Sequence, residues 1–408
     1  MRSTHKPLTV SFFGHFGCSN AGNESTLLAV LTRLRRLYPD GQFRCICTDP
    51  DAVVTRYGID AVRITTRTVR IWDREIPLTR RLAMALVGLG AELRQYVRAF
   101  WTLEGTDMLI IPGTGLVTDA FGLADWGPYN LFKWVLVAKL RRSRVLFMSV
   151  GAGPIDRAAG RVLARTALSL ADYRSYRDVA SREYARRIGL GAKRDRVYPD
   201  LVFSLPEALL LSDPRPQGAR RVVGLGLKVY EGKYSASNPR PETYSSYLES
   251  LAAFAAWLLE HDYDIRLLLG DADTFVIADF RSALQGRLGT YDEGRILQQP
   301  IESPQDLLAQ IAATDVVVAT RFHNVLLAML LNKPVIAISF HHKCSSLMSQ
   351  IQLPEYCHDI HSIDTKRLIA QFRMLEQNRA AVEQKLGEGA DEARAALDEQ
   401  YALLFASR

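Results

Sequence analysis

The sequence predicts an α/β protein built from two domains, each with a parallel sheet covered by helices. Short apolar segments typical of buried strands alternate with amphipathic helical segments along most of the chain. The chain has 408 residues, which is more than one ordinary core accommodates. A stretch rich in proline and glycine, Ser204–Ala219, interrupts the alternation near the middle and is expected to link the domains.

The first half predicts a Rossmann-like domain over residues 1–205. Its expected strands are Thr9–Phe13, Phe43–Cys47, Met108–Pro112, Val145–Val150 and Tyr173–Arg177. Its expected helices are Ser25–Leu37, Leu82–Phe100, Asn130–Leu140, Ala158–Leu170 and Val179–Ile188.

The second half predicts a second Rossmann-like domain over residues 206–385, facing the first across a cleft. Its expected strands are Val222–Leu227, Ile265–Leu269, Val316–Ala319 and Val335–Ser339, and its expected helices are Glu242–Leu259, Thr274–Leu284 and Pro304–Ala313. Residues 232–241 read as a mobile loop at the mouth of the cleft. The charged tail from Lys366 to Leu404 is expected to be helical, and residues 386–408 to pack back on the first domain.

The composition is typical of a soluble globular protein, with 48% hydrophobic and 23% charged residues. No segment reaches the roughly 20 apolar residues that span a bilayer, and the N-terminus does not resemble a signal peptide. An odd number of cysteines, five, in a chain of this size argues against a disulfide framework. These observations favour the cytoplasm.

The net charge of +7 is unevenly distributed. Residues 1–205 hold 31 Lys and Arg against 18 Asp and Glu, whereas residues 206–408 hold 20 against 26. A basic half predicts an anionic partner, such as a nucleotide or a phospholipid surface. The alternative is that the arginines only reflect a high-GC coding sequence. Nucleic-acid binding is not expected, because no known module or aromatic-basic interleaving appears.

The stretch Thr320–Lys343 is the first candidate site. A strand, a charged turn, a helix over Asn324–Leu331 and a second strand bring Arg321, His323 and Lys343 towards one sheet edge, where α/β proteins bind ligands. Two cations and one imidazole suit a small, multiply charged anion. Any one of the three side chains taken alone would more often be an ordinary solvated or core residue.

Two glycine turns that follow strands are further candidates. The first, Gly14–Glu24, brings Asn20, Gly22, Asn23 and Glu24 to a helix start, where backbone N–H groups suit an anion or a sugar. Its alternative is ordinary capping by Asn23 or Ser25.

The second turn is Ile111–Asp119, with Gly113, Gly115 and Asp119 as candidate ligand-binding residues and helix capping as the favoured alternative. Arg177 ends the expected strand Tyr173–Arg177 and is placed to reach the cleft. Asp178, the next residue, is more typical of a helix start than of an acid catalyst.

Several common catalytic motifs are missing from the sequence. It has no HExxH, CxxC, GxSxG or Walker A motif, so neither a metal nor a bound cofactor is expected. His341 and His342 were considered as metal ligands, but adjacent residues in an extended chain point apart.

These motifs in this order resemble the polysaccharide pyruvyl transferase family. The matching features are the first glycine turn, the glycine turn ending in Asp119, Arg177-Asp178-x-x-Ser181, the Pro-Asp pair at Asp200, and Arg321-x-His323 with Lys343 twenty residues beyond. The sequence departs from the family pattern at Asn23, where an acidic residue is usual, at PGTG in the second turn, and at Phe340–Lys343, which lacks the usual Tyr.

The resemblance implies a GT-B-like fold and transfer of a pyruvyl group from phosphoenolpyruvate to a saccharide or lipid-linked saccharide, giving a cyclic ketal and phosphate. It gives catalytic roles to Arg177, His323 and Lys343 and donor binding to Arg321, with the acceptor on the first domain. A lipid-linked acceptor would suit peripheral association with the inner membrane face.

Two other functions remain open. One is a GT-B glycosyltransferase that uses a nucleotide sugar, for which Gly270–Asp273 is the only nucleotide signal. The other is a catalytically silent protein that binds anions or saccharides. The sequence gives neither the acceptor sugar nor the oligomeric state.

Overall fold

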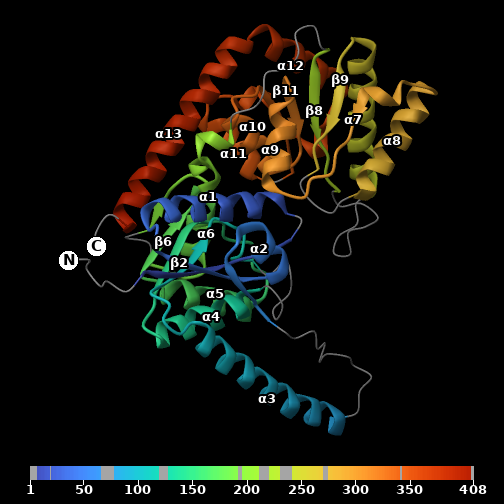
Figure 1. The fold of residues 1–408 in the computed structure, drawn as a ribbon. Coiled ribbons are helices and arrows are strands. Elements are labelled where there is room, and N and C mark those ends of the chain that lie inside the picture. The colour runs from blue at the N-terminus through green and yellow to red at the C-terminus, as the bar shows by residue number, and fades with distance from the viewer. Residues whose placement is uncertain are drawn as a thin grey trace. The chain divides into compact units, whose positions relative to one another are not determined.

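The computed structural model describes residues 7–18, 20–65, 78–118, 127–191, 195–210, 220–229, 241–269, 274–340 and 342–405, and for residues 78–87, 241, 274 and 342 the backbone alone. The chain divides into two compact units (Figure 1). Unit 1 comprises Met1–Cys18, Thr26–Ser204 and Glu399–Arg408, and unit 2 comprises Ser19–Ser25 and Leu205–Asp398. The predicted loop over residues 232–241 lies outside the described residues except for Pro241, which begins a helix, and so do the nucleotide signal Gly270–Asp273 and most of the predicted linker.

Unit 1 contains a seven-stranded parallel sheet in the order β3-β2-β1-β4-β5-β6-β7. Its central strands are buried, as expected for parallel strands between two helical layers. The strands are β1 (Thr9–Phe13), β2 (Gln42–Cys47), β3 (Asp60–Arg63), β4 (Met108–Pro112), β5 (Arg144–Val150), β6 (Tyr173–Tyr176) and β7 (Arg196–Val197). The helices are α1 (Ala21–Leu37), α2 (Pro50–Tyr57), α3 (Leu78–Thr102), α4 (Pro128–Leu140), α5 (Ala158–Ser169) and α6 (Val179–Arg187).

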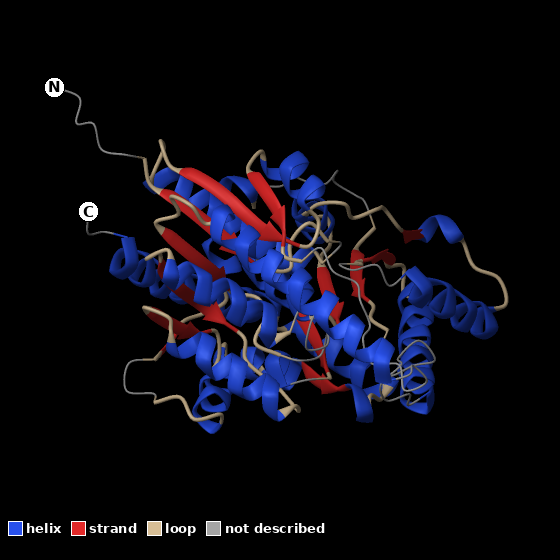
Figure 2. Cartoon of the chain, turned by 90° about the horizontal axis from the view of Figure 1, so that it is seen from below, coloured by secondary structure: helices blue, strands red, loops and turns tan. Residues whose placement is uncertain are grey.

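Unit 2 contains a six-stranded parallel sheet in the order β10-β9-β8-β11-β12-β13, again flanked by helices (Figure 2). The strands are β8 (Val222–Gly226), β9 (Asp264–Leu267), β10 (Ile296–Leu297), β11 (Val316–Ala319), β12 (Val335–Ser339) and β13 (Cys357–Asp359). The helices are α7 (Pro241–Glu260), α8 (Thr274–Leu288), α9 (Pro304–Ala312), α10 (Phe322–Leu330), α11 (His342–Gln350), α12 (Thr365–Gln377) and α13 (Arg379–Phe405).

The predicted α/β class and the alternation of strands and helices are confirmed. Thr9–Phe13, Met108–Pro112, Val316–Ala319 and Val335–Ser339 are strands with the predicted bounds. The sequence reading missed α2, β3, α11, β13 and the two-residue strand β10. The strand end expected at Val197–Asp200 corresponds to β7. A signal for α2 was present, because Asp49 and Pro50 start the helix and Gly58 ends it in the left-handed conformation.

Two predictions of local structure were wrong. Helix α1 begins four residues before the predicted Ser25, because the Asn20 side chain accepts hydrogen bonds from the Gly22 and Asn23 amides at 3.1 Å and so caps the helix earlier. His342 was expected in an extended chain, but it is the first residue of α11.

In both sheets the strand order reverses direction at one place, between β1 and β4 in unit 1 and between β8 and β11 in unit 2. Helices on opposite sides diverge there, and open α/β sheets bind ligands beside the carboxyl ends of the strands at this point. The glycine turn at Gly113 follows β4, and Arg321 follows β11, so each unit places candidate residues at its own reversal point.

The last turns of α13 belong to unit 1 and are held by a buried polar network. Gln400 is fully buried, and its amide nitrogen donates to Ser175 Oγ at 2.6 Å and to Tyr173 Oη at 3.2 Å. Ser149 Oγ donates to the amide oxygen of Gln400 at 3.4 Å. Residues 386–405 of the predicted separate C-terminal helix are therefore the second half of α13, whose end is fixed to β5 and β6, and residues 406–408 lie outside the described residues. None of the described helices is both long and apolar enough to cross a membrane.

Replacement of Gly226 by Ala is expected to destabilise the protein. A Cβ at Gly226 would lie 2.7 Å from Ala319 Cβ and from Asn324 Nδ2, at the tightest part of the β8–β11 pairing. The expected loss of unfolding free energy is about 1–3 kcal/mol, measured by urea denaturation. Gly286 is the matched control, because it lies exposed in α8 with open space around it, and Gly286→Ala should stabilise by about 0.5–1 kcal/mol. Equal effects of the two substitutions would contradict this packing.

Candidate functional site

A pocket of unit 2 lies at the reversal point of its sheet, where the chain leaves β8, β11 and β12. Arg321, Phe322, His323 and Asn324 follow β11, Lys228 follows β8, and Phe340 follows β12. Asn20 and Gly22, at the start of α1, are grouped with the same unit and complete the wall together with Leu307. The pocket holds about 390 Å³ of empty space, including its open mouth.

The turn between β11 and α10 is held to the neighbouring strands by side-chain hydrogen bonds. Arg321 Nε donates to the Leu227 carbonyl and Asn324 Nδ2 to the Leu268 carbonyl, both at 3.0 Å. Both side chains are buried, with exposed fractions of 8% and 1%. These bonds fix the first turn of α10 against the ends of β8 and β9, so the backbone that carries His323 is firmly positioned.

Arg321 is the N-cap residue of α10, and its side chain does not cap the helix. The first N–H groups of the helix and the positive end of its dipole are therefore directed to the pocket side of the turn, where an anion is stabilised. The nine described residues that line the pocket include Arg321, Lys228 and His323 but no Asp or Glu. Two fixed cations, an imidazole and a helix N-terminus are groups that suit an anion.

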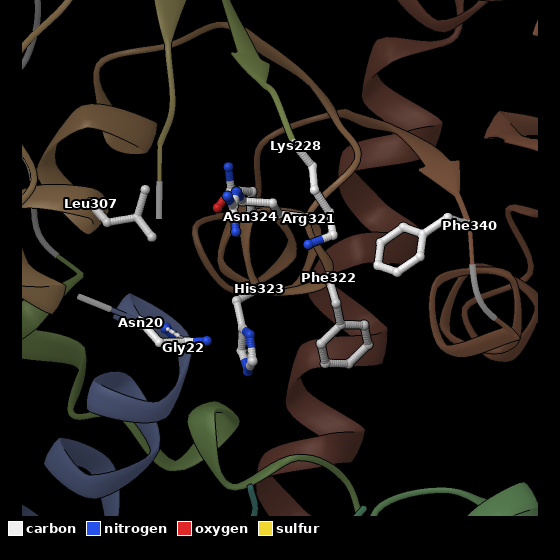
Figure 3. A pocket seen from close by; sticks show the side chains of 9 residues that line it. All are labelled: Asn20, Gly22, Lys228, Leu307, Arg321, Phe322, His323, Asn324 and Phe340. Carbon is white, nitrogen blue, oxygen red and sulfur yellow. Dashed lines mark hydrogen bonds between the residues drawn. The ribbon is translucent and has the colours of Figure 1, made fainter. Parts of the chain in front are cut away.

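His323 packs directly against the backbone of Gly22. A Cβ at Gly22 would lie only 2.0 Å from His323 Nδ1 and 2.2 Å from its Cγ. Figure 3 shows the imidazole beside the start of α1, with the side chains of Lys228 and His323 directed towards the same space. On its other side the imidazole meets the Phe322 ring edge-to-face, with centroids 5.2 Å apart. Gly22, predicted as a substrate-binding residue, thus makes room for the imidazole.

Lys228 is a pocket residue that the sequence reading missed. Its ammonium group lies 5.3 Å from the centre of the Phe340 ring. Its backbone N–H donates to Tyr247 Oη at 3.2 Å, and this hydroxyl also bonds Thr320 Oγ1 at 2.8 Å. Burial raises the pKa of Tyr247 to about 12, so the phenol stays neutral and links β8 to β11. The sequence did contain a signal for Lys228 as a site residue, because it directly follows the predicted strand Val222–Leu227 of the same sheet.

The structure brings together four of the predicted site residues, Asn20, Gly22, Arg321 and His323. Lys343 is the second residue of α11 and is not among the residues that line the pocket. Neither are Asn23 and Glu24, which continue the first turn of α1.

Arg177, Gly113 and Gly115 belong to unit 1, and Asp119 lies outside the described residues. Gly113 has φ of +26°, and a Cβ there would lie 3.0 Å from Thr26 Cγ2, whereas Gly115 has open space around it.

The Arg177 segment forms a buried network inside unit 1. Arg177 Nη1 donates to Asp200 at 3.3 Å, and the Asp178 carboxylate caps α6 by accepting from the Ser181 amide at 2.6 Å. Ser181 Oγ in turn accepts from the Ala152 amide at 3.0 Å. Asp178 is thus a helix-start residue, as predicted. Removing one partner from a buried ion pair of this kind is costly, so Arg177 and Asp200 also support the fold.

A second hollow of about 760 Å³ adjoins the pocket and shares Phe340 with it. Among its described lining residues are hydroxyl, imidazole and carboxylate groups but neither Lys nor Arg, which suits a neutral ligand rich in hydroxyl groups. The lining residues are Ser339, Phe340, Ser345, Ser349, Pro354, Cys357, His358, Asp359 and His361. Within the described residues, no group of three or more His, Cys, Asp and Glu side chains could hold a metal ion.

The family model for polysaccharide pyruvyl transferase matches residues 20–342, which are most of the chain. The chain belongs to the polysaccharide pyruvyl transferase family. The match begins at Asn20 and ends at His342, so it includes every residue that lines the pocket. A relative from Erwinia amylovora, amylovoran biosynthesis protein AmsJ, is 27% identical over 84 residues, which are 21% of this chain and only 20% of AmsJ.

Solved structures confirm the GT-B-like fold of this pyruvyl transferase family member. HepE from Anabaena, in complex with UDP-glucose, aligns with a TM-score of 0.61 over 98% of this chain and 100% of its own, at 14% identity. UDP-GlcNAc 2-epimerase from Neisseria meningitidis, bound to UDP-GlcNAc, aligns with a TM-score of 0.57 over 97% of this chain and 100% of its own, at 11% identity. At these identities the likeness concerns the fold alone.

Replacement of Gly22 by Ala is expected to displace the His323 imidazole, because the new methyl group would overlap the ring. The measurement is the NMR signal of the His323 ring, assigned by its loss in His323→Gln. Gly115→Ala is the control, since open space surrounds that glycine. An unchanged His323 signal in Gly22→Ala would show that the ring does not pack against α1.

Proposed function

We propose that this protein transfers the pyruvyl group of phosphoenolpyruvate to two hydroxyl groups of a saccharide, forming a cyclic ketal and releasing phosphate. Membership of the polysaccharide pyruvyl transferase family supports a saccharide product. The observation that carries the proposal is the pocket at the reversal point of unit 2, in which Arg321, Lys228 and His323 meet at the start of α10.

The charges of the pocket complement those of phosphoenolpyruvate. This donor carries a phosphate and a carboxylate on a three-carbon skeleton, so it needs several cationic or N–H donors at short range. The Arg321 guanidinium has five N–H donors, of which Nε binds the Leu227 carbonyl and fixes the plane of the group. Lys228 and the start of α10 supply further positive potential, which also stabilises the departing phosphate.

The reaction moves two protons. The methylene carbon of the donor gains one proton to become a methyl group, and the first acceptor hydroxyl attacks the adjacent carbon. The second hydroxyl then displaces phosphate, so the two hydroxyl protons end on the methyl carbon and on phosphate. An imidazole titrates near neutral pH and can give and take these protons. Among the residues that line the pocket, His323 has this chemistry.

The hollow across Phe340 offers a second place for a saccharide acceptor, as an alternative to the first-domain residues that the family resemblance implies. Its serine and histidine groups can exchange hydrogen bonds with sugar hydroxyls, and Phe340 offers an apolar face for a sugar ring. The acceptor can equally be carried on a lipid. Arg177 and Lys343 are proposed to contribute to catalysis, and Asn20, Asn23, Glu24, Gly113, Gly115 and Asp119 to acceptor binding, as the family resemblance implies.

The expected result is phosphate release from phosphoenolpyruvate that depends on an added saccharide and yields a pyruvylated product by mass spectrometry. The same protein is incubated with UDP-glucose and UDP-GlcNAc, the ligands of the structural neighbours. Turnover of a UDP-sugar without turnover of phosphoenolpyruvate would favour a glycosyltransferase. Donor binding without turnover across a broad acceptor panel would favour a silent binding protein.

His323→Gln is the matched variant for this assay, because it keeps the size and hydrogen bonding of the side chain but cannot move a proton. It should lower kcat by at least about 100-fold and change donor affinity little, as expected for loss of a general acid–base group. Near-normal turnover in this variant would remove His323 from the mechanism.

Lys228→Met is expected to weaken phosphoenolpyruvate binding by about tenfold or more, because a charge-assisted contact with the donor is lost. Isothermal titration with the donor measures the effect, and Lys343→Met is the comparison, since Lys343 does not line the pocket. If Lys343→Met weakens donor binding and Lys228→Met does not, the donor lies at the start of α11 and not in the pocket.

A further inference from the structure

Helix α3 of unit 1 carries an apolar face that the rest of the described structure leaves exposed. Five large side chains lie on it, four of them spaced four residues apart and the fifth three residues after Val97, which places them along one side of the helix. We call Leu89, Leu93, Val97, Phe100 and Trp101 the outer face of α3; their exposed fractions are 70%, 65%, 49%, 36% and 61%. Contiguous exposed apolar surface of this kind marks an interaction site.

The opposite side of α3 holds the helix in place. Gln95, Ala99 and Leu103 are buried there. Glu92 accepts hydrogen bonds from the buried Lys133 ammonium at 2.9 Å and from the Tyr129 hydroxyl at 2.7 Å. Because this side is packed and holds the Glu92–Lys133 ion pair, the exposed outer face is a fixed feature of the fold. Figure 1 shows α3 extending outwards from the other elements of unit 1.

The apolar surface continues beyond the helix. Trp101 and Thr102 line an open hollow with Val54 and with Ala61 and Val62 of the edge strand β3, and the ion pair of Arg44 and Asp60 lies at the same hollow. Val54 is itself 48% exposed. The face therefore extends from Leu89 past Trp101, a helix length of about 18 Å at 1.5 Å per residue.

The charge of α3 and of residues 1–205 indicates what kind of partner the outer face binds. The sequence of α3 has four arginines, Arg80, Arg81, Arg94 and Arg98, and one carboxylate, Glu92, which is engaged on the packed side. Arg94 is exposed, whereas Arg98 donates to the backbone carbonyls of Arg63 and Ile64. Residues 1–205 as a whole carry 31 basic against 18 acidic residues. A symmetric contact between two copies of α3 would bring these like charges together. An anionic lipid surface instead attracts them and accepts leucine, phenylalanine and tryptophan at the boundary of headgroups and acyl chains.

We propose that the outer face of α3 docks the protein on an anionic lipid bilayer, with the helix lying in the plane of the interface. Leu89, Leu93 and Val97 enter the acyl boundary, and Trp101 lies at headgroup depth. Arg94, which is exposed beside Leu93, contacts lipid phosphates.

The test is flotation of the full-length protein with phosphatidylcholine vesicles. One set of vesicles contains about 30% phosphatidylglycerol, an anionic lipid, and the other set contains none. Binding should require the anionic lipid and weaken with salt. Leu89→Gln combined with Leu93→Gln should lower partitioning at least about tenfold, because the apolar contact is lost without a change of charge. Arg94→Gln should lower it by about fivefold.

Val162→Gln combined with Leu403→Gln is the control, because these exposed apolar side chains of unit 1 lie on other helices. This pair should bind vesicles as the unaltered protein does. Absence of binding to anionic vesicles would overturn the proposal, and so would binding that the Leu89 and Leu93 substitutions leave unchanged. Light scattering completes the test: a dimer that these two substitutions dissociate would assign the face to a second copy of the chain.

Discussion

The candidate site depends on the parallel connectivity of the unit 2 sheet. Because all its strands run in the same direction, β8, β11 and β12 end at one edge, and residues more than a hundred positions apart meet there. The reversal of strand order between β8 and β11 leaves the space that the ligand needs. Chemistry at this edge can vary without altering the buried strands, which explains how one fold serves proteins of different activity.

The edge is also well suited to hold charge. Arg321 and Asn324 use side-chain N–H groups to satisfy carbonyls at the ends of two neighbouring strands, at Leu227 and Leu268. Carbonyls at strand ends have lost their ladder partners, so each bond satisfies a group whose burial would otherwise be costly. The same bonds orient the cation and the helix start before any ligand arrives, which lowers the cost of ordering them on binding.

The sequence predicted the helices and strands better than it predicted which residues the fold brings together in the pocket. Alternating apolar runs such as Val335–Ser339 identify buried strands, because burial on both faces requires continuous apolar residues. Short elements such as β13 have too few residues to show a period. Arg321 and His323 were found because they follow a strand directly. Lys228 was missed, although it follows a predicted strand, because no motif surrounds it. The position of Lys343 depends on α11, which carries no strong helical pattern in the sequence.

The close packing of Gly22 against His323 links two positions that are three hundred residues apart in the chain. A side chain at the first position and an imidazole in this orientation at the second exclude one another. The two residues are therefore expected to vary together in proteins that share this pocket. A glycine in the second position of the first helix can then serve as a marker, in an otherwise divergent sequence, that the distant histidine keeps the same orientation. A larger residue there would indicate that the histidine is absent or turned elsewhere.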